Sequence, residues 1–307
     1  MDSYSPQPPA VGPDNRGITR KLILVILLFC LVGLWTIRAH AVRAAVDRME
    51  SMLGRKSDVP ATPPAVSTVD LEAKLAPMTA QGQAELLLSE ALNHRPGALE
   101  LLAARTDAWR GNLQETPRLT QLLQAAWNSS DLQVRGASLE LQLDINDIRK
   151  DTESVSTLEQ RVAEEPEARP WALWMLGILG NRGVEPIGVL REELNYVNDP
   201  DDQTRAWAVE GLATLGTNEA IDPLLDALRN DPSATVRERA ACGLAEAGMF
   251  TREQRRTAVP RLLDFAEDPA LDPGTRNWVF RALQDITGAG KGSDAQAWRK
   301  WWQQHGQ

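Results

Sequence analysis

The sequence predicts an all-α protein in which an α-solenoid of paired helices follows a single transmembrane helix. Two observations predict this fold: an uncharged apolar run at residues 22–37, and a helix-pair pattern that recurs every 32–39 residues toward the C-terminus. No segment alternates apolar and polar residues as a half-buried strand would. The expected organisation is a disordered tail (1–17), a transmembrane helix (18–40), a juxtamembrane helix (41–57), a Pro/Ala/Thr linker (58–70), a divergent helical region (71–130) and repeats (131–302).

The apolar run is slightly short for a bilayer core of ~30 Å, because sixteen residues at ~1.5 Å each span roughly 24 Å. Arg20, Lys21 and Arg38 extend it if their methylenes lie in the bilayer and their charges reach the interface. A transmembrane helix over 18–40 follows. The alternative is a cleaved signal peptide, since residues 39–41 (Ala-His-Ala) resemble a cleavage site, although the run exceeds the usual ~7–15 residues.

The charges that flank the apolar run do not decide on which side of the membrane the C-terminal body lies. Five basic residues between 38 and 56 favour a cytoplasmic body, whereas a short basic tail before an anchor is typical of an uncleaved export signal. We expect a single-pass protein of a bacterial inner membrane with a periplasmic body. Residues 41–57 repeat apolar positions at helical spacing, so this helix either continues the anchor as a stalk or lies along the membrane.

The large C-terminal body is acidic. Residues 1–57 hold eight Lys/Arg and four Asp/Glu, whereas residues 58–307 hold 25 Lys/Arg and 38 Asp/Glu. A body without a basic stripe is not expected to bind nucleic acid, because phosphates require Lys or Arg. The cysteines, Cys30 and Cys242, leave the body without an internal disulfide, so packing must stabilise it.

The repeat is seen by aligning five arginines, each near the start of a predicted helix. They are Arg135, Arg169, Arg205, Arg237 and Arg276, with spacings of 34, 36, 32 and 39 residues. An acidic residue followed by proline precedes the last four, which suits a helix start. Gly180, Gly216, Gly248 and Gly288 are expected to end these first helices. A second helix is expected to begin near residues 184, 221 and 259.

These Val/Thr-Arg pairs, the small residues after them and the Leu-Gly endings resemble the HEAT-repeat family, including its bacterial HEAT-like and phycobilisome-lyase-type members. A tetratricopeptide array has a similar period, but its Trp-x2-Leu-Gly-x2-Tyr pattern is absent. The resemblance implies protein binding in most members and lyase activity in a few. It also implies that the five arginines form a structural ladder with acidic groups near the turns, for which Asp202, Asp231 and Asp268 are candidates.

A second column lies two positions after the arginines and is rich in large side chains. Trp171, Trp207, Arg239 and Trp278 occupy it, after Ala137 in the first repeat. Since packed helices lie ~8–10 Å apart, these residues are expected to form either an interface strip or part of the core between repeats.

The C-terminal tryptophans Trp298, Trp301 and Trp302 share one helical face. They are expected to cap the solenoid, with a carbohydrate or peptide platform as the alternative. Residues 251–256 form a basic island, interpreted as a solvated loop or as part of a binding face.

Recognisable catalytic chemistry is missing from the sequence. The three histidines (His40, His94, His305) are not at metal-ligand spacing, and residues 288–293 fail the phosphate-loop pattern. We therefore expect no catalytic, cofactor or metal site. The main hypothesis is a membrane-tethered scaffold for unidentified, membrane-associated protein partners. The alternatives are a lyase or chaperone-like activity on a bound tetrapyrrole or protein, and a homo-oligomer that pairs through residues 41–57.

Overall fold

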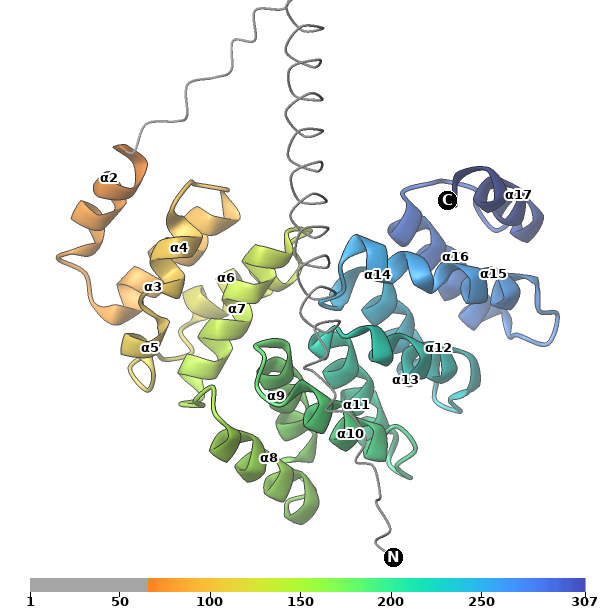
Figure 1. Ribbon diagram of the computed structural model, residues 1–307, viewed down its shortest axis with the longest axis horizontal. Helices are drawn as coiled ribbons and strands as arrows, with labels where there is room; N and C mark the ends of the chain where they lie inside the picture. The colour runs from red at the N-terminus through yellow and green to blue at the C-terminus, as the bar shows by residue number, and fades with distance from the viewer. Residues whose placement is uncertain (1–65, 307) are drawn as a thin grey trace, which may run out of the picture. The chain divides into compact units, whose positions relative to one another are not determined.

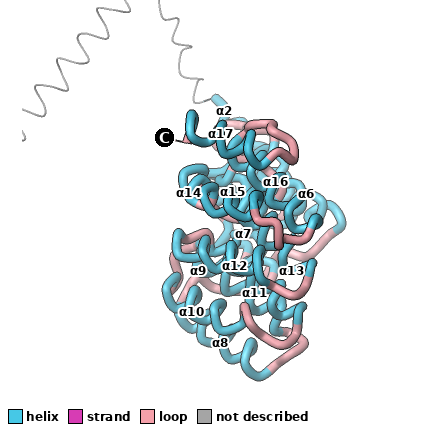
Figure 2. The backbone as a smooth tube through the Cα atoms, turned by 90° about the vertical axis from the view of Figure 1, so that its right-hand side faces the viewer, coloured by secondary structure: helices cyan, strands magenta, loops and turns pink. Residues whose placement is uncertain are grey.

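The computed structural model describes residues 66–306, all of them in helices or loops, without a β-strand (Figures 1 and 2). The described residues belong to one compact unit. The helices are α2 (Val66–Leu75), α3 (Ala80–Leu92), α4 (Ala98–Ala103), α5 (Thr106–Trp109), α6 (Pro117–Trp127), α7 (Leu132–Ile145), α8 (Thr152–Glu164), α9 (Arg169–Asn181), α10 (Pro186–Tyr196), α11 (Asp202–Leu215), the 3-10 helix η1 (Asn218–Ala220), α12 (Ile221–Asn230), α13 (Ala234–Cys242), the π-helix η2 (Gly243–Ala247), α14 (Arg252–Thr257), α15 (Val259–Glu267), α16 (Pro273–Thr287) and α17 (Ala295–His305).

The predicted tail (1–17), transmembrane helix (18–40) and juxtamembrane helix (41–57) lie outside the described residues. Within residues 66–306, no helix has the length and apolar character needed to cross a bilayer. The linker predicted over 58–70 extends too far, because α2 already begins at Val66. Its residues Leu71 and Leu75 are buried, so packing against the helices that follow draws this segment into the body.

The repeats form two layers of helices. The first helices of successive pairs, α9, α11, α13 and α16, contact one another in that order. The second helices, α10, α12, α15 and α17, lie behind them, and each contacts at least one helix of the first layer or its neighbour in the second. In Figure 1 the helices α8–α11 lie between an N-terminal group (α2–α7) and a C-terminal group (α12–α17). This arrangement leaves the first layer to line a concave face.

Small residues let α9 and α11 approach closely. A side chain at Gly177 would lie 2.5 Å from the carbonyl oxygen of Gly211, and one at Gly211 would collide with Glu193. The Glu193 carboxyl is buried without a hydrogen-bond partner among the described residues. Burial, reinforced by Glu192, raises the pKa of Glu193 well above its ordinary value.

Two of the four predicted glycine stops are left-handed C-caps, namely Gly216 (φ 69°) and Gly288 (φ 72°). Gly248 also follows the end of a helix, but in an extended conformation. The prediction for Gly180 is wrong, because α9 continues to Asn181. A side chain at Gly180 would lie 2.5 Å from Leu215, so this glycine serves helix packing instead.

Three arginines of the ladder connect consecutive turns. Arg205 and Arg237 donate to backbone carbonyls of the turn before their own helix, and Arg169 donates to the carbonyl of Val162 in α8. Each also approaches a carboxylate of the next turn: Arg169 to Asp199 (3.7 Å), Arg205 to Asp231 (2.9 Å) and Arg237 to Asp272 (3.6 Å). Arg276 donates to the carbonyls of Asp268 (2.6 Å) and Leu271 (2.8 Å). Of the expected carboxylate partners, Asp231 serves as predicted. Asp202 instead accepts a hydrogen bond from Ser233, and Asp268 pairs with Arg229.

Arg135 does not take part in this ladder. Its guanidinium is buried and donates to the carbonyls of Glu246 and Gly248 (2.9 Å for Gly248), more than a hundred residues further along the chain. No acidic-Pro pair precedes Arg135, unlike the other four arginines. Burial and the nearby Arg255 lower the pKa of Arg135 to about 10. It therefore joins α7 to the end of η2.

The predicted C-terminal tryptophans come together on α17. Trp298 is buried, its indole donates to the carbonyl of Gly292 (2.9 Å), and its ring meets Trp301 edge-on at 6.1 Å. Trp302 is partly buried beneath Arg256, whose guanidinium lies 4.9 Å from the ring centroid. These contacts cover the last part of the apolar core.

Replacing Arg205 tests the ladder. Its side chain and that of Asp231 are 9% and 5% exposed, so Arg205→Ala leaves a buried carboxylate unpaired and is expected to lower the free energy of unfolding by about 3 kcal/mol. The control is Arg261→Ala, which breaks half-exposed pairs with Asp222 and Asp226 and is expected to cost less than about 1 kcal/mol. Urea titrations followed by circular dichroism measure both. Equal losses would contradict the ladder.

Candidate functional site

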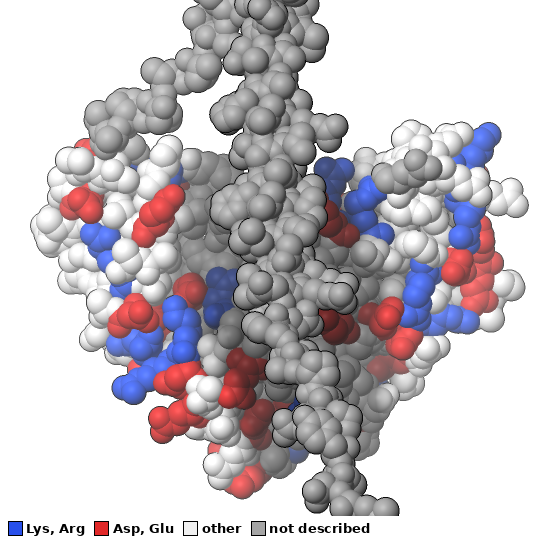
Figure 3. Space-filling model, viewed as in Figure 1, with Lys and Arg blue, Asp and Glu red and all other residues white. Residues whose placement is uncertain are grey.

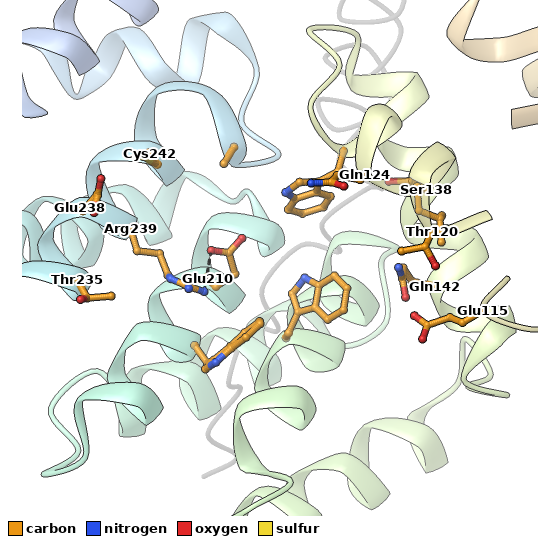
Figure 4. Close-up of a pocket in the computed structure, with 15 residues that line it drawn as sticks. Glu115, Thr120, Gln124, Ser138, Gln142, Glu210, Thr235, Glu238, Arg239 and Cys242 are labelled. Atoms are coloured by element: carbon orange, nitrogen blue, oxygen red, sulfur yellow. Dashed lines mark hydrogen bonds and ion pairs between the residues drawn. The ribbon is translucent and has the colours of Figure 1, made fainter. Parts of the chain in front are cut away.

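The concave face holds a cavity of about 570 Å³, here called the aromatic groove. One wall comes from α6 and α7, the other from α11 and α13, and α9 contributes between them (Figure 4). The groove is lined by Glu115, Thr120, Leu123, Gln124, Trp127, Ser138, Gln142, Trp174, Trp207, Glu210, Thr235, Glu238, Arg239, Cys242 and Ala247.

Three tryptophans from three helices meet in this groove. Trp127 meets Trp174 edge-on with ring centroids 6.3 Å apart, and Trp174 lies 6.3 Å from Trp207 in a tilted arrangement. All three side chains are only partly buried. They therefore present a continuous aromatic surface to the cavity, held in place by mutual contact.

A charged pair extends this surface. The Arg239 guanidinium lies 4.9 Å from the centroid of the Trp207 ring and 3.4 Å from the Glu210 carboxylate. Figure 4 shows the two charged side chains pointing toward one another. Burial raises the pKa of Glu210 above its ordinary value, and the nearby Arg239 only partly opposes this. The groove thus combines open indole faces with a carboxylate that is poorly compensated.

The structure brings together only part of the predicted strip. Trp207 and Arg239 are in contact, as the sequence predicted for neighbouring repeats. Trp171 lies outside the groove, with the Arg161 guanidinium 5.3 Å from its ring centroid. Trp278 lines a smaller cavity of about 100 Å³, which shares Glu238 and Cys242 with the aromatic groove. Trp207, Arg239 and Trp278 therefore lie in adjoining cavities, without Trp171, and their role as an interface strip stays a prediction.

Sequence reasoning missed Trp127, Trp174 and Glu210. Trp174 follows Trp171 by three positions, so the two rings share one side of α9, and only tertiary packing selects which one faces the groove. Trp127 precedes the first aligned repeat and was outside the repeat register. Glu210 follows Trp207 by three positions, and this spacing indicates that the two side chains lie on the same face of α11.

The basic island at 251–256 is a helix rather than a loop. Thr251 caps α14 through a capping box with Gln254. Arg255 donates to the carbonyls of Phe250 (3.0 Å) and Gly248 (3.1 Å), and Arg256 covers Trp302. Two of its arginines are thus engaged in internal contacts.

Charge on the visible described surface is mixed. Figure 3 shows acidic and basic side chains lying side by side on that face, without a continuous basic stripe. In residues 66–306, no cluster of three or more His, Cys, Asp and Glu side chains has a geometry that could hold a metal ion.

Comparison with known proteins supports the repeats. Residues 155–245 match the family model for HEAT repeats. No curated protein matches the chain. The region is thus an all-helical, solenoid-like array with HEAT-like repeats.

Similar solved structures include the complex of CpcE and CpcF of phycocyanin lyase from Nostoc sp. PCC7120, at 22% identity over 50% of this chain and 89% of that chain, with a TM-score of 0.35. Another is a designed armadillo repeat protein in complex with the peptide (KR)4, at 15% identity over 68% of this chain and 100% of that chain, with a TM-score of 0.32.

Removing the Arg239 side-chain charge tests the electrostatics of the groove. Arg239→Met is compared at pH 5 and pH 8. Because burial raises the pKa of Glu210, its carboxyl is protonated more readily at pH 5 than that of an exposed glutamate, and where it is neutral the change loses only the stacking on Trp207, about 1 kcal/mol. A larger fraction of Glu210 is ionised at pH 8, where the change also removes the cation beside that charge, so a larger loss is expected there. In a Glu210→Gln background the loss is expected to be equal at both pH values. Thermal unfolding measures the four variants, and a pH-independent cost in the single variant would contradict this account.

Proposed function

We propose that this protein is a membrane-tethered HEAT-repeat scaffold that binds a protein partner in the aromatic groove and does not itself catalyse a reaction. The observation that carries this proposal is the cluster of Trp127, Trp174 and Trp207, whose partly exposed rings line an open cavity. Trp and Arg are the residues that most often dominate binding energy at protein interfaces.

Rigidity of the groove favours specific binding. The tryptophans belong to α6, α9 and α11, and their mutual contacts fix their positions before a partner arrives. A preformed surface loses little conformational entropy on binding. Among the described residues, no arginine or lysine lies over the rings of Trp127 and Trp174, whereas Arg239 lies over Trp207 and Arg256 over Trp302.

The membrane tether is proposed from the sequence of residues 18–40. An anchor places the groove near membrane-associated partners and raises their effective concentration. We propose the periplasmic side of a bacterial inner membrane for the body, from the layout of a short basic tail followed by an anchor. The lyase or chaperone-like alternative stays a prediction from the family resemblance alone.

Capture of partners from membranes tests the groove. A photo-crosslinker is attached to Cys242, an exposed groove residue, in a full-length Cys30→Ser chain. We expect partner adducts that fall at least tenfold in Trp174→Ala/Trp207→Ala, because the aromatic surface is lost. Trp171→Ala is the matched control, since Trp171 lies on the same helix outside the groove. Equal capture by both variants, or crosslinks only between copies of this chain, would contradict the proposal.

Charges placed in the apolar run test the tether. Leu28→Asp/Leu31→Asp is expected to move the chain from the alkali-resistant membrane fraction to the supernatant, because each buried charge costs about 3 kcal/mol in a bilayer. Met49→Asp, in the juxtamembrane segment, is expected to leave the chain in the membrane fraction. A mature N-terminus near residue 41, measured by mass spectrometry, would instead support the cleaved signal peptide.

A further inference from the structure

The aromatic groove continues beyond its three tryptophans. The adjoining cavity at α13 and α16 shares Glu238 and Cys242 with it and adds Trp278. Together the two cavities extend from α6 to α16 along the concave face. A chain segment that lies along this face would contact several helices at once.

The lining of this extended groove has an excess of negative charge. Its carboxylates are Glu115, Glu210, Glu238, Glu246 and Asp285, against the guanidiniums of Arg239 and Arg281. Burial raises the pKa of both Glu210 and Asp285, and the neighbouring Glu246 adds to the effect at Asp285. Arg135 and Arg255 lie near Glu246 and offset part of its charge, but Arg239 and Arg281 do not overcome the effect of burial at Glu210 and Asp285. An incoming cation would therefore be attracted to these two carboxylates.

The groove already holds one guanidinium in a stacked position. Arg239 lies over Trp207 and beside Glu210, so one indole and one carboxylate together accept a cation there. Among the described residues, no Lys or Arg covers Trp127 or Trp174 in the same way. These two indoles offer further faces of the same kind, because an aromatic face attracts cations through its quadrupole.

We propose that the partner segment in this groove is cationic, with at least two arginine or lysine side chains that lie against the free indole faces and the carboxylates of the groove. This inference rests on the proposed function and adds the chemistry of the partner. Aliphatic stems of Arg and Lys pack on indoles while their charges reach carboxylates, so such side chains satisfy both features of the lining.

Binding of synthetic peptides tests the proposal. Full-length protein in a nonionic detergent is titrated against fluorescent peptides of repeated Arg-Ala-Ser, Gln-Ala-Ser or Glu-Ala-Ser units, with fluorescence anisotropy as the readout. The Arg peptide is expected to bind roughly tenfold more tightly than the Gln peptide, a difference of about 1.4 kcal/mol. Its affinity is expected to fall as salt is added, since the attraction is screened.

Single substitutions test whether the Arg peptide binds in the groove. Trp174→Ala and Glu238→Gln are each expected to weaken the Arg peptide several-fold. The matched controls are Trp171→Ala and Glu219→Gln, which remove an indole and a charge outside the groove and are expected to have little effect. Equal losses from Glu238→Gln and Glu219→Gln would show that only overall charge matters and would overturn the proposal.

Other outcomes separate this inference from the proposed function. Equal binding of the Arg and Gln peptides, or preference for the Glu peptide or for the anionic tetrapyrrole biliverdin, would overturn the cationic segment. If partner capture at Cys242 still depended on Trp174 and Trp207, the scaffold function would stand. If the Arg peptide bound as expected but no membrane protein were captured, the cationic site would stand and the scaffold function would fail.

Discussion

The contact between an arginine and the carboxylate of the next turn is the interaction on which the repeat array depends. One helix pair cannot bury its own apolar face, so each pair must be held in register with its neighbour. Arg205 does this with its planar fork, binding the Asp199 carbonyl of its own turn and both oxygens of Asp231 in the next. Asp231 also accepts the backbone amide of Ser233, which shapes the turn. Lysine lacks the fork geometry for this double role.

Register along this ladder sets the geometry of the groove. Arg205 and Arg237 occupy similar places on their helices, so the residues two positions later, Trp207 and Arg239, both reach the groove, whereas Trp171, two positions after Arg169, lies outside it. Trp207 and Arg239 meet in this way across α11 and α13. The close approach of α9 and α11 at Gly177 and Gly211 brings Trp174 within reach of Trp207. The aromatic surface is thus a consequence of how the repeats stack.

The helical repeat and most helix starts follow from the sequence, because they depend on local chemistry. Capping residues, prolines and apolar spacing lie within a few positions of the features they determine. The exceptions are set by contacts between distant segments. Arg135 binds carbonyls at the end of η2 instead of a neighbouring turn. Gly180 is buried against Leu215, and Trp174 rather than Trp171 lines the groove. No local pattern around these residues encodes those partners.

The structural use of arginine also shapes the charge of the binding face. Arg135, Arg255 and Arg276 donate hydrogen bonds to backbone carbonyls, which are uncharged acceptors. No ion pair within 4 Å is formed by these three arginines among the described residues, although Arg135 and Arg255 lie near enough to Glu246 for its charge to raise their pKa values. In a region with 25 basic and 38 acidic residues, this increases the number of carboxylates without a close cation. Several of them line the concave face beside indoles, where a partner's cation gains both Coulomb attraction and stacking. The arginine–carbonyl hydrogen bonds that stabilise the repeats thereby help make the groove selective for positive charge.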